Sequence, residues 1–318
     1  MEGFANRTEL IVRTALALSQ QRVGDERPWR EVHLSLGLAA GGHFVPGVKL
    51  ANGGPDLIAA VGAGELDLAE VNPAALVGLA VRGTGPFAAP LPLRVIGVLP
   101  AWDGMGFAVA ERTGITSLDE LAAHRQPLRL SVRETASHSS RLLINEVFAA
   151  LGTRLEDIVG RGGSLQMAEM PVDPIRLAAI RDESIDGVMD EGATRWGALA
   201  LEHGMRLLSV DGEARKRLDS IGWPVLTLPQ SRLPRLPEPI TVASLSGYPL
   251  VTHDSLSEDT AYRMCLALER TLEELPWQGA RIDMRRLCSN TDEAPLTAPL
   301  HPGAERFYSE RGLLGFRT

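Results

Sequence analysis

The stretch PDLIAAVGAGELDLAEVN, residues 55–72, has a counterpart in PIRLAAIRDESIDGVMDE, residues 174–191. Both read as a helix with one apolar face, a short polar break and an apolar strand that opens on an acid, Asp67 or Asp186. A helix–strand unit that occurs twice in the sequence predicts two related lobes. The alternative is a chance likeness of two ordinary helix–strand units, because the copies share only Pro, Ala-Ala and Asp at matching places.

Strand and helix patterns alternate along the rest of the chain, which predicts an α/β fold with largely parallel sheets. Helices are expected at 8–21, 73–81, 117–123, 140–151, 194–202, 258–275 and 304–311, and strands at 32–38, 95–99, 105–110, 128–132, 205–210 and within 241–252. The stretch 223–239 is rich in proline, which opposes helices and central strands. We therefore interpret it as a linker or a surface crossing.

Two crossings of the chain between the lobes are predicted. The chain leaves the first lobe near Gly104 and returns after the proline-rich stretch, so lobe I comprises residues 1–105 plus 240–318 and holds both termini. Lobe II comprises residues 106–239. Paired crossings make a hinge, and hinged lobes commonly enclose a small molecule in a central cleft.

The composition limits the kinds of molecule that the protein is expected to bind. The net charge of −8 and the pI near 5.5 argue against nucleic-acid binding, which requires clustered basic residues. Cys265 and Cys288 are predicted to be buried thiols, and the histidines form no metal-binding pattern, so we expect no metal and no cofactor. No run is apolar enough for membrane insertion. Because residues 1–21 lack an export leader, the sequence as written predicts a cytoplasmic protein, and a periplasmic one if a leader was removed.

Polar residues at predicted strand ends are candidates for the ligand site, since ligands of open α/β sheets bind beyond the carboxyl ends of the strands. These are Asn72, Arg133, Asp190 and Glu191. Arg133 either grips an anionic ligand or pairs with Glu134 or Glu191. Asp190 and Glu191 favour an ammonium group or hydroxyls, because adjacent acids repel an anion unless one is protonated or paired; the alternative is a solvated pair. Asn72 suits a neutral polar ligand or caps the following helix.

Two loops complete the candidate site. Ser137, His138 and Ser139 precede a helix, whose free N–H groups favour anions, and the alternative is plain helix capping. Gly41 and Gly42 allow the main chain to approach a ligand. His43 and Phe44 add a polar and a stacking contact, and the alternative for these four residues is an ordinary turn with an aromatic anchor.

Several segments resemble the TAXI family of solute receptors, which serve TRAP-type transporters. The most specific is PLHPGAERFYSE, residues 299–310; GGPDLIAAVGAGELDLAEV, residues 53–71, LDELAAHRQPLRLSV, residues 118–132, and YPLVTHDSLSEDTAYRMCLAL, residues 248–268, are also similar. The resemblance implies a type II periplasmic-binding-protein fold, a small organic ligand such as an amino acid or organic acid, and TRAP membrane subunits as possible partners. The chain departs from the family in its shortened segment before Gly53, in a ligand loop without glycine at 134–139 and in the missing leader.

Three functions are compatible with this pattern. A solute-binding protein without catalytic activity is the main interpretation. A cytosolic, decarboxylase-like enzyme on a similar scaffold is the second: Ser137 or Ser139 with a histidine and Asp190 would form a nucleophile relay, or His138 with Asp190 or Glu191 an acid–base pair, although no GxSxG frame is present. A metabolite-sensing regulatory protein is the third.

Overall fold

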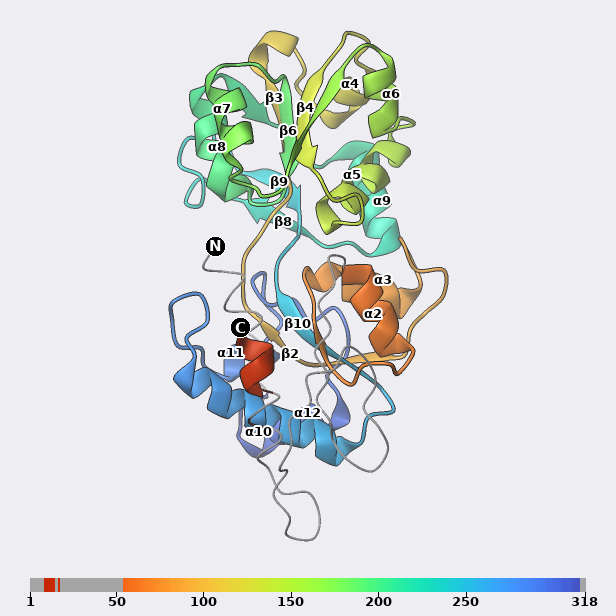
Figure 1. Ribbon diagram of the computed structural model, residues 1–318, viewed down its shortest axis with the longest axis vertical. Coiled ribbons are helices and arrows are strands. Elements are labelled where there is room, and N and C mark those ends of the chain that lie inside the picture. The colour runs from red at the N-terminus through yellow and green to blue at the C-terminus, as the bar shows by residue number, and fades with distance from the viewer. Residues whose placement is uncertain (1–8, 15–16, 18–53, 315–318) are drawn as a thin grey trace. The chain divides into compact units, whose positions relative to one another are not determined.

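The computed structural model describes residues 9–14, 17 and 54–314. The predicted strand at 32–38 and the candidate residues Gly41, Gly42, His43 and Phe44 lie outside the described residues. The chain forms two compact units (Figure 1). Unit 1 comprises Met1–Gly83, Ala89–Ala101 and Gly247–Thr318, and unit 2 comprises Thr84–Ala88 and Trp102–Ser246. The predicted fold class, a two-lobed α/β chain, is confirmed. The two main crossings, expected near residues 105 and 240, correspond to unit boundaries after Ala101 and after Ser246.

Unit 1 is built on a three-stranded antiparallel sheet of order β1-β10-β2, formed by Ala69–Glu70, Tyr248–His253 and Leu93–Leu99. Its helices are α2 (Gly54–Gly62), α3 (Ala74–Arg82), α10 (Glu258–Glu274), α11 (Arg285–Cys288) and α12 (Pro302–Glu310). Residues 9–14 are helical as well, and the buried Leu10 joins the core of α10, α12 and β2. Cys265 and Cys288 are buried free thiols, as predicted.

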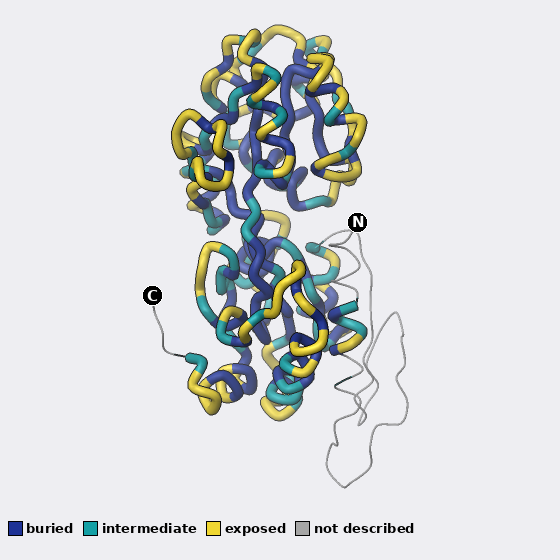
Figure 2. Tube along the Cα trace, turned by 90° about the vertical axis from the view of Figure 1, so that its left-hand side faces the viewer, coloured by how far each residue is buried: buried dark blue, intermediate teal, exposed yellow. Residues whose placement is uncertain are grey.

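Unit 2 is built on a five-stranded sheet of order β5-β4-β6-β3-β7. The strands are β3 (Gly106–Ala110), β4 (Arg129–Arg133), β5 (Ser164–Ala168), β6 (Gly187–Asp190) and β7 (Met205–Leu207), and β8 (Val225–Leu228) pairs with β9 (Ile240–Ala243) in a second sheet. The helices are η1 (Glu111–Thr113), α4 (Leu118–Ala123), α5 (Ser139–Ala150), α6 (Leu155–Gly160), α7 (Pro174–Arg181), α8 (Ala193–Glu202) and α9 (Gly212–Ile221). In each unit most of the sheet is buried and most exposed residues lie on helices and turns, with exceptions such as Ser164 and Met167 of the edge strand β5 (Figure 2).

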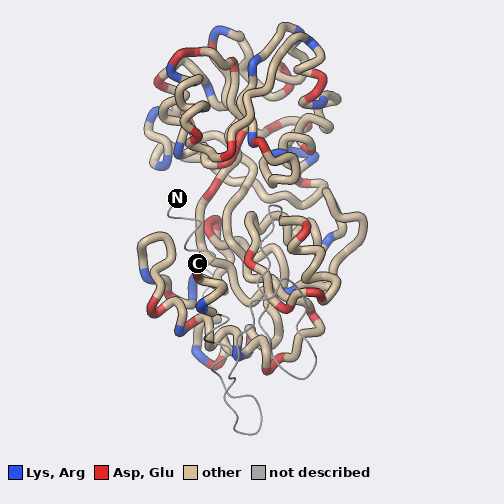
Figure 3. Tube along the Cα trace, in the orientation of Figure 1, with Lys and Arg blue, Asp and Glu red and all other residues tan. Residues whose placement is uncertain are grey.

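Local signals in the sequence have their expected structural outcome. The Ser117 hydroxyl accepts the backbone N–H of Glu120 at 3.1 Å, and the Glu120 carboxylate accepts the N–H of Thr116, which caps α4 as predicted. Gly152 follows α5 with a φ of +68°, the left-handed conformation that ends helices. The basic residues 215–217 lie on α9 among acids, as predicted, and Figure 3 shows basic and acidic residues interspersed over both units.

The prediction of largely parallel sheets is wrong. Among the strands described at residues 54–314, only the β4–β5 and β4–β6 pairs are parallel, whereas β3 runs antiparallel to β6 and β7, and β10 runs antiparallel to both of its neighbours. The reason is connectivity: β3 and β10 enter their sheets directly from a crossing between units, without the helical crossover that a parallel neighbour requires.

The proline-rich stretch 223–239 is not a linker between the units, although its second half, residues 229–239, is mostly exposed and runs over the surface of unit 2. It lies wholly in unit 2, forms β8 and buries Trp223, Leu228 and Leu233. Its prolines flank β8 instead of interrupting it: Pro224 precedes the strand and Pro229 follows it. Because proline only removes hydrogen bonds at the positions it occupies, a short strand between two prolines still pairs with β9.

The two copies of the opening motif share their element order but not their place in a sheet. The first gives α2 and the two-residue β1, at the edge of an antiparallel sheet, and the second gives α7 and β6, inside a mixed sheet. Asp186 of the second copy pairs with Arg112 and Arg129, each at 2.9 Å, within unit 2. None of the helices among residues 54–314 has the length and apolar character needed to span a bilayer.

Candidate functional site

Buried charge concentrates at the carboxyl ends of β4 and β6 in unit 2. Arg133 is the last residue of β4, Asp190 is the last residue of β6, and Glu191 follows directly. The two strands are parallel neighbours, with Val132 opposite Met189, so their ends meet at one edge of the sheet. Three of the residues selected from the sequence are thereby brought together.

The guanidinium of Arg133 is paired within the protein. Its Nε donates to Asp190 Oδ1 at 3.3 Å, its Nη2 donates to Glu191 Oε1 at 2.8 Å, and its Nη1 donates to the carbonyl of Glu169. Arg133 is only 3% exposed. Of the pairings considered from the sequence, the one with Glu191 is present, and Glu134 is exposed.

A second arginine, Arg176 on α7, completes this charged group. Its Nε donates to Ser131 Oγ at 2.9 Å, and its Nη1 donates to Asp190 Oδ2 and to the carbonyls of Met170 and Pro171. Within the described part of the chain its Nη2 is buried and has no hydrogen-bond partner. Asp190, fully buried, therefore forms ion pairs with two buried arginines at once.

Sequence reasoning missed Arg176, although a signal was present. Arg176, Ala179 and Ile180 are spaced i, i+3, i+4 on α7 and all three are buried. An arginine on the apolar stripe of a helix indicates a buried charge that needs a partner, because long basic side chains are rarely fully buried unless paired.

The loop after β6 is held by Asp103 and Trp196. Asp103 Oδ1 accepts the N–H of Gly192 at 2.9 Å and that of Gly104 at 2.7 Å. Trp196 Nε1 donates to the carbonyl of Glu191 at 2.9 Å. Gly192 has a φ of +68°, and a Cβ there would lie 3.0 Å from Pro171. The hydrogen bonds with Asp103 and Trp196 thus fix the backbone of Glu191 and Gly192.

Two of these acids hold their protons unusually tightly. Burial raises the pKa of Glu191 to about 7, assisted by repulsion from Asp103 and Asp190 and opposed by Arg133 and Arg195. Burial likewise raises the pKa of Asp103 to about 6, against the N–H donors of Gly192 and Gly104 and the charge of Arg195. The cluster therefore exchanges protons close to neutral pH.

This geometry predicts a stability that depends on pH. Glu191 has a higher pKa in the folded chain, about 7, than its ordinary value of 4.5, so the folded state holds more protons between these values. The free energy of unfolding must then fall as pH rises through this interval. Glu191→Gln is expected to flatten the fall, measured by urea denaturation at about pH 5 and about pH 7.5. An unchanged difference between the two pH values would contradict it.

The loop 137–139 meets the same cluster through His138. The His138 Nδ1 accepts the N–H of Ser140 at 3.2 Å and caps α5, so the neutral ring carries its proton on Nε2, which lies 3.9 Å from Glu191 Oε1. Helix capping, the alternative considered for this loop, is present for His138. Ser137 is exposed and Ser139 is buried.

Asn72 lies in unit 1, whereas the other described candidates lie in unit 2. Its Nδ2 donates to the carbonyl of Gly247 at 3.2 Å. It does not cap α3, because the residue at the N-cap is Pro73. Its predicted contact with a ligand stays a prediction.

The Nδ1 of His138 accepts the N–H of Ser140, so this atom is not available to take a proton from Ser137 or Ser139. The nucleophile relay considered from the sequence stays a prediction. Among residues 9–14, 17 and 54–314, no three His, Cys, Asp or Glu side chains gather as metal ligands would.

The comparison with family models decides the family. Residues 45–312 match the model of the NMT1-like family, which is most of the chain. The chain belongs to the NMT1-like family. A search of curated proteins found no match for this NMT1-like protein.

Solved structures similar to this NMT1-like protein include XAC2383 from Xanthomonas citri bound to ATP, at 14% identity, with 98% of this chain and 94% of that chain covered and a TM-score of 0.44. The periplasmic binding protein BugD is similar at 12% identity, with 96% and 88% covered and a TM-score of 0.44. A binding protein component of an ABC phosphonate transporter from Pseudomonas aeruginosa is similar at 13% identity, with 86% and 75% covered and a TM-score of 0.39.

Proposed function

We propose that this NMT1-like protein is a solute-binding protein for a small polar organic molecule that carries an ammonium group, such as an amino acid. The observation that carries the proposal is the partly exposed carboxyl of Glu191, held at the shared edge of β4 and β6 by a buried charge network. The carboxyl ends of such strands are the usual place for a ligand in an α/β fold.

The accessible groups at this edge select the ligand class. The side chains of Arg133 and Asp190 are 4% and 0% exposed and pair with each other, whereas those of Glu191 and His138 are 16% and 25% exposed. A ligand therefore meets an acid first and the two arginines hardly at all. Glu191 suits an ammonium group, and the Nε2–H of His138 suits a hydroxyl or a carboxylate oxygen.

Calorimetric titration of the full chain with amino acids, after a thermal-shift screen, tests this function. Glu191→Gln keeps the shape and removes the charge, and we expect it to weaken binding of an ammonium-bearing ligand by more than about tenfold, which is about 1.4 kcal/mol. Glu156→Gln, an exposed acid on α6, is the matched control and should bind like the parent chain. Equal affinity in the Glu191→Gln variant would remove Glu191 from the site.

The proposal includes closing of the two units on the ligand and delivery to a membrane transporter. Small-angle scattering with and without ligand tests closing, since a closed form has a smaller radius of gyration. The likeness of residues 299–310 to TAXI receptors favours TRAP-type membrane subunits as partners. Neighbouring genes for TRAP-type subunits would support this partner. A neighbouring gene for an ABC-type permease would instead support an ABC-type transporter. Cell fractionation tests a periplasmic location.

The ligand-bound protein also allows a solute receptor to be distinguished from an enzyme. NMR spectra of the ligand over time distinguish binding from turnover, because a solute receptor leaves the ligand unchanged. A gene neighbourhood of catabolic enzymes without any permease would favour a regulator or an enzyme over a transport receptor.

A further inference from the structure

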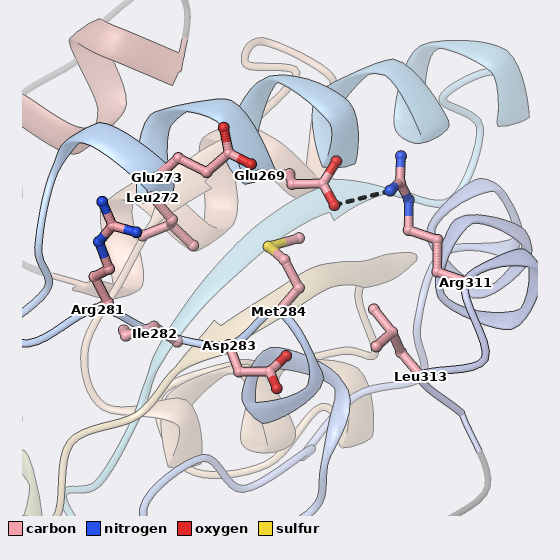
Figure 4. A pocket seen from close by; sticks show the side chains of 9 residues that line it. All are labelled: Glu269, Leu272, Glu273, Arg281, Ile282, Asp283, Met284, Arg311 and Leu313. Carbon is pink, nitrogen blue, oxygen red and sulfur yellow. Dashed lines mark ion pairs between the residues drawn. The ribbon is translucent and has the colours of Figure 1, made fainter.

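A cavity lies wholly within unit 1, among described residues that the proposed solute site does not use. It has a volume of about 500 Å³ and is bounded by the second half of α10, by residues 281–284 and by the segment after α12 (Figure 4). Cavities of this size fall in the range that holds small organic molecules.

The cavity has an apolar floor. Leu272 and Met284 are buried in the core of unit 1, and Ile282 and Leu313 pack against that core. Figure 4 shows these side chains between the charged groups. Because Leu272 and Met284 belong to the packed core, the floor is a fixed surface that can bury an apolar ligand group.

One wall carries charges that already have partners. Arg311 Nη1 lies 3.0 Å from Glu269 Oε1, and its guanidinium stacks 4.5 Å from the centre of the Phe307 ring. The charges of Arg311 and Glu269 neutralise each other, and their contact fixes this side of the cavity. The pair adds no net charge to the cavity.

The remaining rim carries charges of both signs that are free to meet a ligand. Within residues 54–314, Arg281 and Glu273 have no hydrogen bond or ion pair, and both are exposed. Asp283 uses Oδ1 to accept the N–H of Arg285 at 2.8 Å. Two carboxylates and one guanidinium thus surround an apolar floor.

We propose that this cavity binds an apolar amino acid, with its ammonium group between Glu273 and Asp283, its carboxylate on Arg281 and its side chain on the apolar floor. The match is chemical: one zwitterion satisfies both signs of rim charge while its apolar part covers the floor. A simple carboxylate would leave the acids unpaired, and a simple amine would leave Arg281 unpaired. The site uses residues of unit 1 only and is independent of Glu191 in unit 2.

The probe is L-phenylalanine, and its binding to the full chain is followed by saturation-transfer difference NMR and by titration. We expect saturable binding that weakens by about tenfold or more in Glu273→Lys, which reverses a rim charge, and in Ile282→Trp, which fills the cavity. Arg281→Gln, a milder change on an exposed residue, should weaken binding of phenylalanine but not of phenethylamine, which lacks the carboxylate.

Asp292→Lys is the matched control, because Asp292 is an exposed acid of unit 1 outside the cavity, and it should bind phenylalanine like the parent chain. Because phenylalanine can also bind at the proposed solute site, the cavity variants are repeated in a Glu191→Gln background: phenylalanine binding to the cavity should persist in Glu191→Gln and should weaken in Glu191→Gln/Glu273→Lys. The inference is overturned if the parent chain shows no saturable binding at millimolar phenylalanine, if Glu273→Lys and Arg281→Gln bind as tightly as the parent, or if Glu191→Gln alone abolishes binding.

Discussion

Asp190→Asn is expected to lower the free energy of unfolding by about 3–5 kcal/mol, the cost of leaving buried charges without their partner. The carboxylate of Asp190 contacts both Arg133 and Arg176, and all three residues are almost completely buried. Asparagine keeps the volume but removes the charge. Two guanidinium groups then remain buried with Glu191 as their one carboxylate partner among the described residues, beside the Ser131 hydroxyl and carbonyl oxygens.

Urea denaturation measures this loss, and Glu156→Gln serves as the control because it neutralises an exposed acid of the same unit. The double variant Asp190→Asn/Arg176→Met provides a second check. If the buried pair is coupled, removing both partners should cost less than the sum of the single changes. A loss below about 1 kcal/mol for Asp190→Asn would show that solvent already reaches the network.

Trp196→Ala is expected to cost about 3–5 kcal/mol of unfolding free energy, as for other large buried aromatics. Trp196 is fully buried in the core of unit 2, and its ring fills the space beside Gly106, where a Cβ would lie 2.5 Å from it. It also donates to the carbonyl of Glu191. The substitution therefore opens a cavity and releases the loop that carries Glu191.

Trp196→Phe separates these two effects, because it keeps most of the ring volume and loses only the Nε1–H donor. We expect it to be less destabilising than Trp196→Ala by chemical denaturation, and to weaken ligand binding if the loop position matters. Equal stability of Trp196→Ala and the parent chain would mean that the core of unit 2 refills around the missing ring.

The sequence predicted those parts of the fold that local signals specify. The repeated motif correctly placed α2, α7 and β6, and Ser117 correctly marked the start of α4. Strand direction was not predictable, because β10 and β3 pair with segments far away in the chain. The helix α6 and the strand β5 were missed: β5 reads SLQMA, and although polar and apolar residues alternate over its first four positions, so short a segment is a weak signal.

The candidate site was predictable only to the same extent. The rule that ligand groups follow parallel strands selected Arg133, Asp190 and Glu191, which the structure brings together. It could not select Asp103 and Arg176, because a loop after β2 and a face of α7 reach the cluster only in three dimensions. Nor could it show that Arg133 is already paired, since pairing depends on distances that spacing along the chain does not contain.

The position of β10 determines the order in which the chain can fold during synthesis. Unit 2 ends at Ser246, and the middle strand of the unit 1 sheet begins only at Tyr248. On the ribosome, β1 and β2 therefore emerge early. They remain unpaired with β10, their common partner, until unit 2 has been translated. Unit 2 is the first part of the nascent chain able to complete its fold, and unit 1 can form its sheet only near the end of translation.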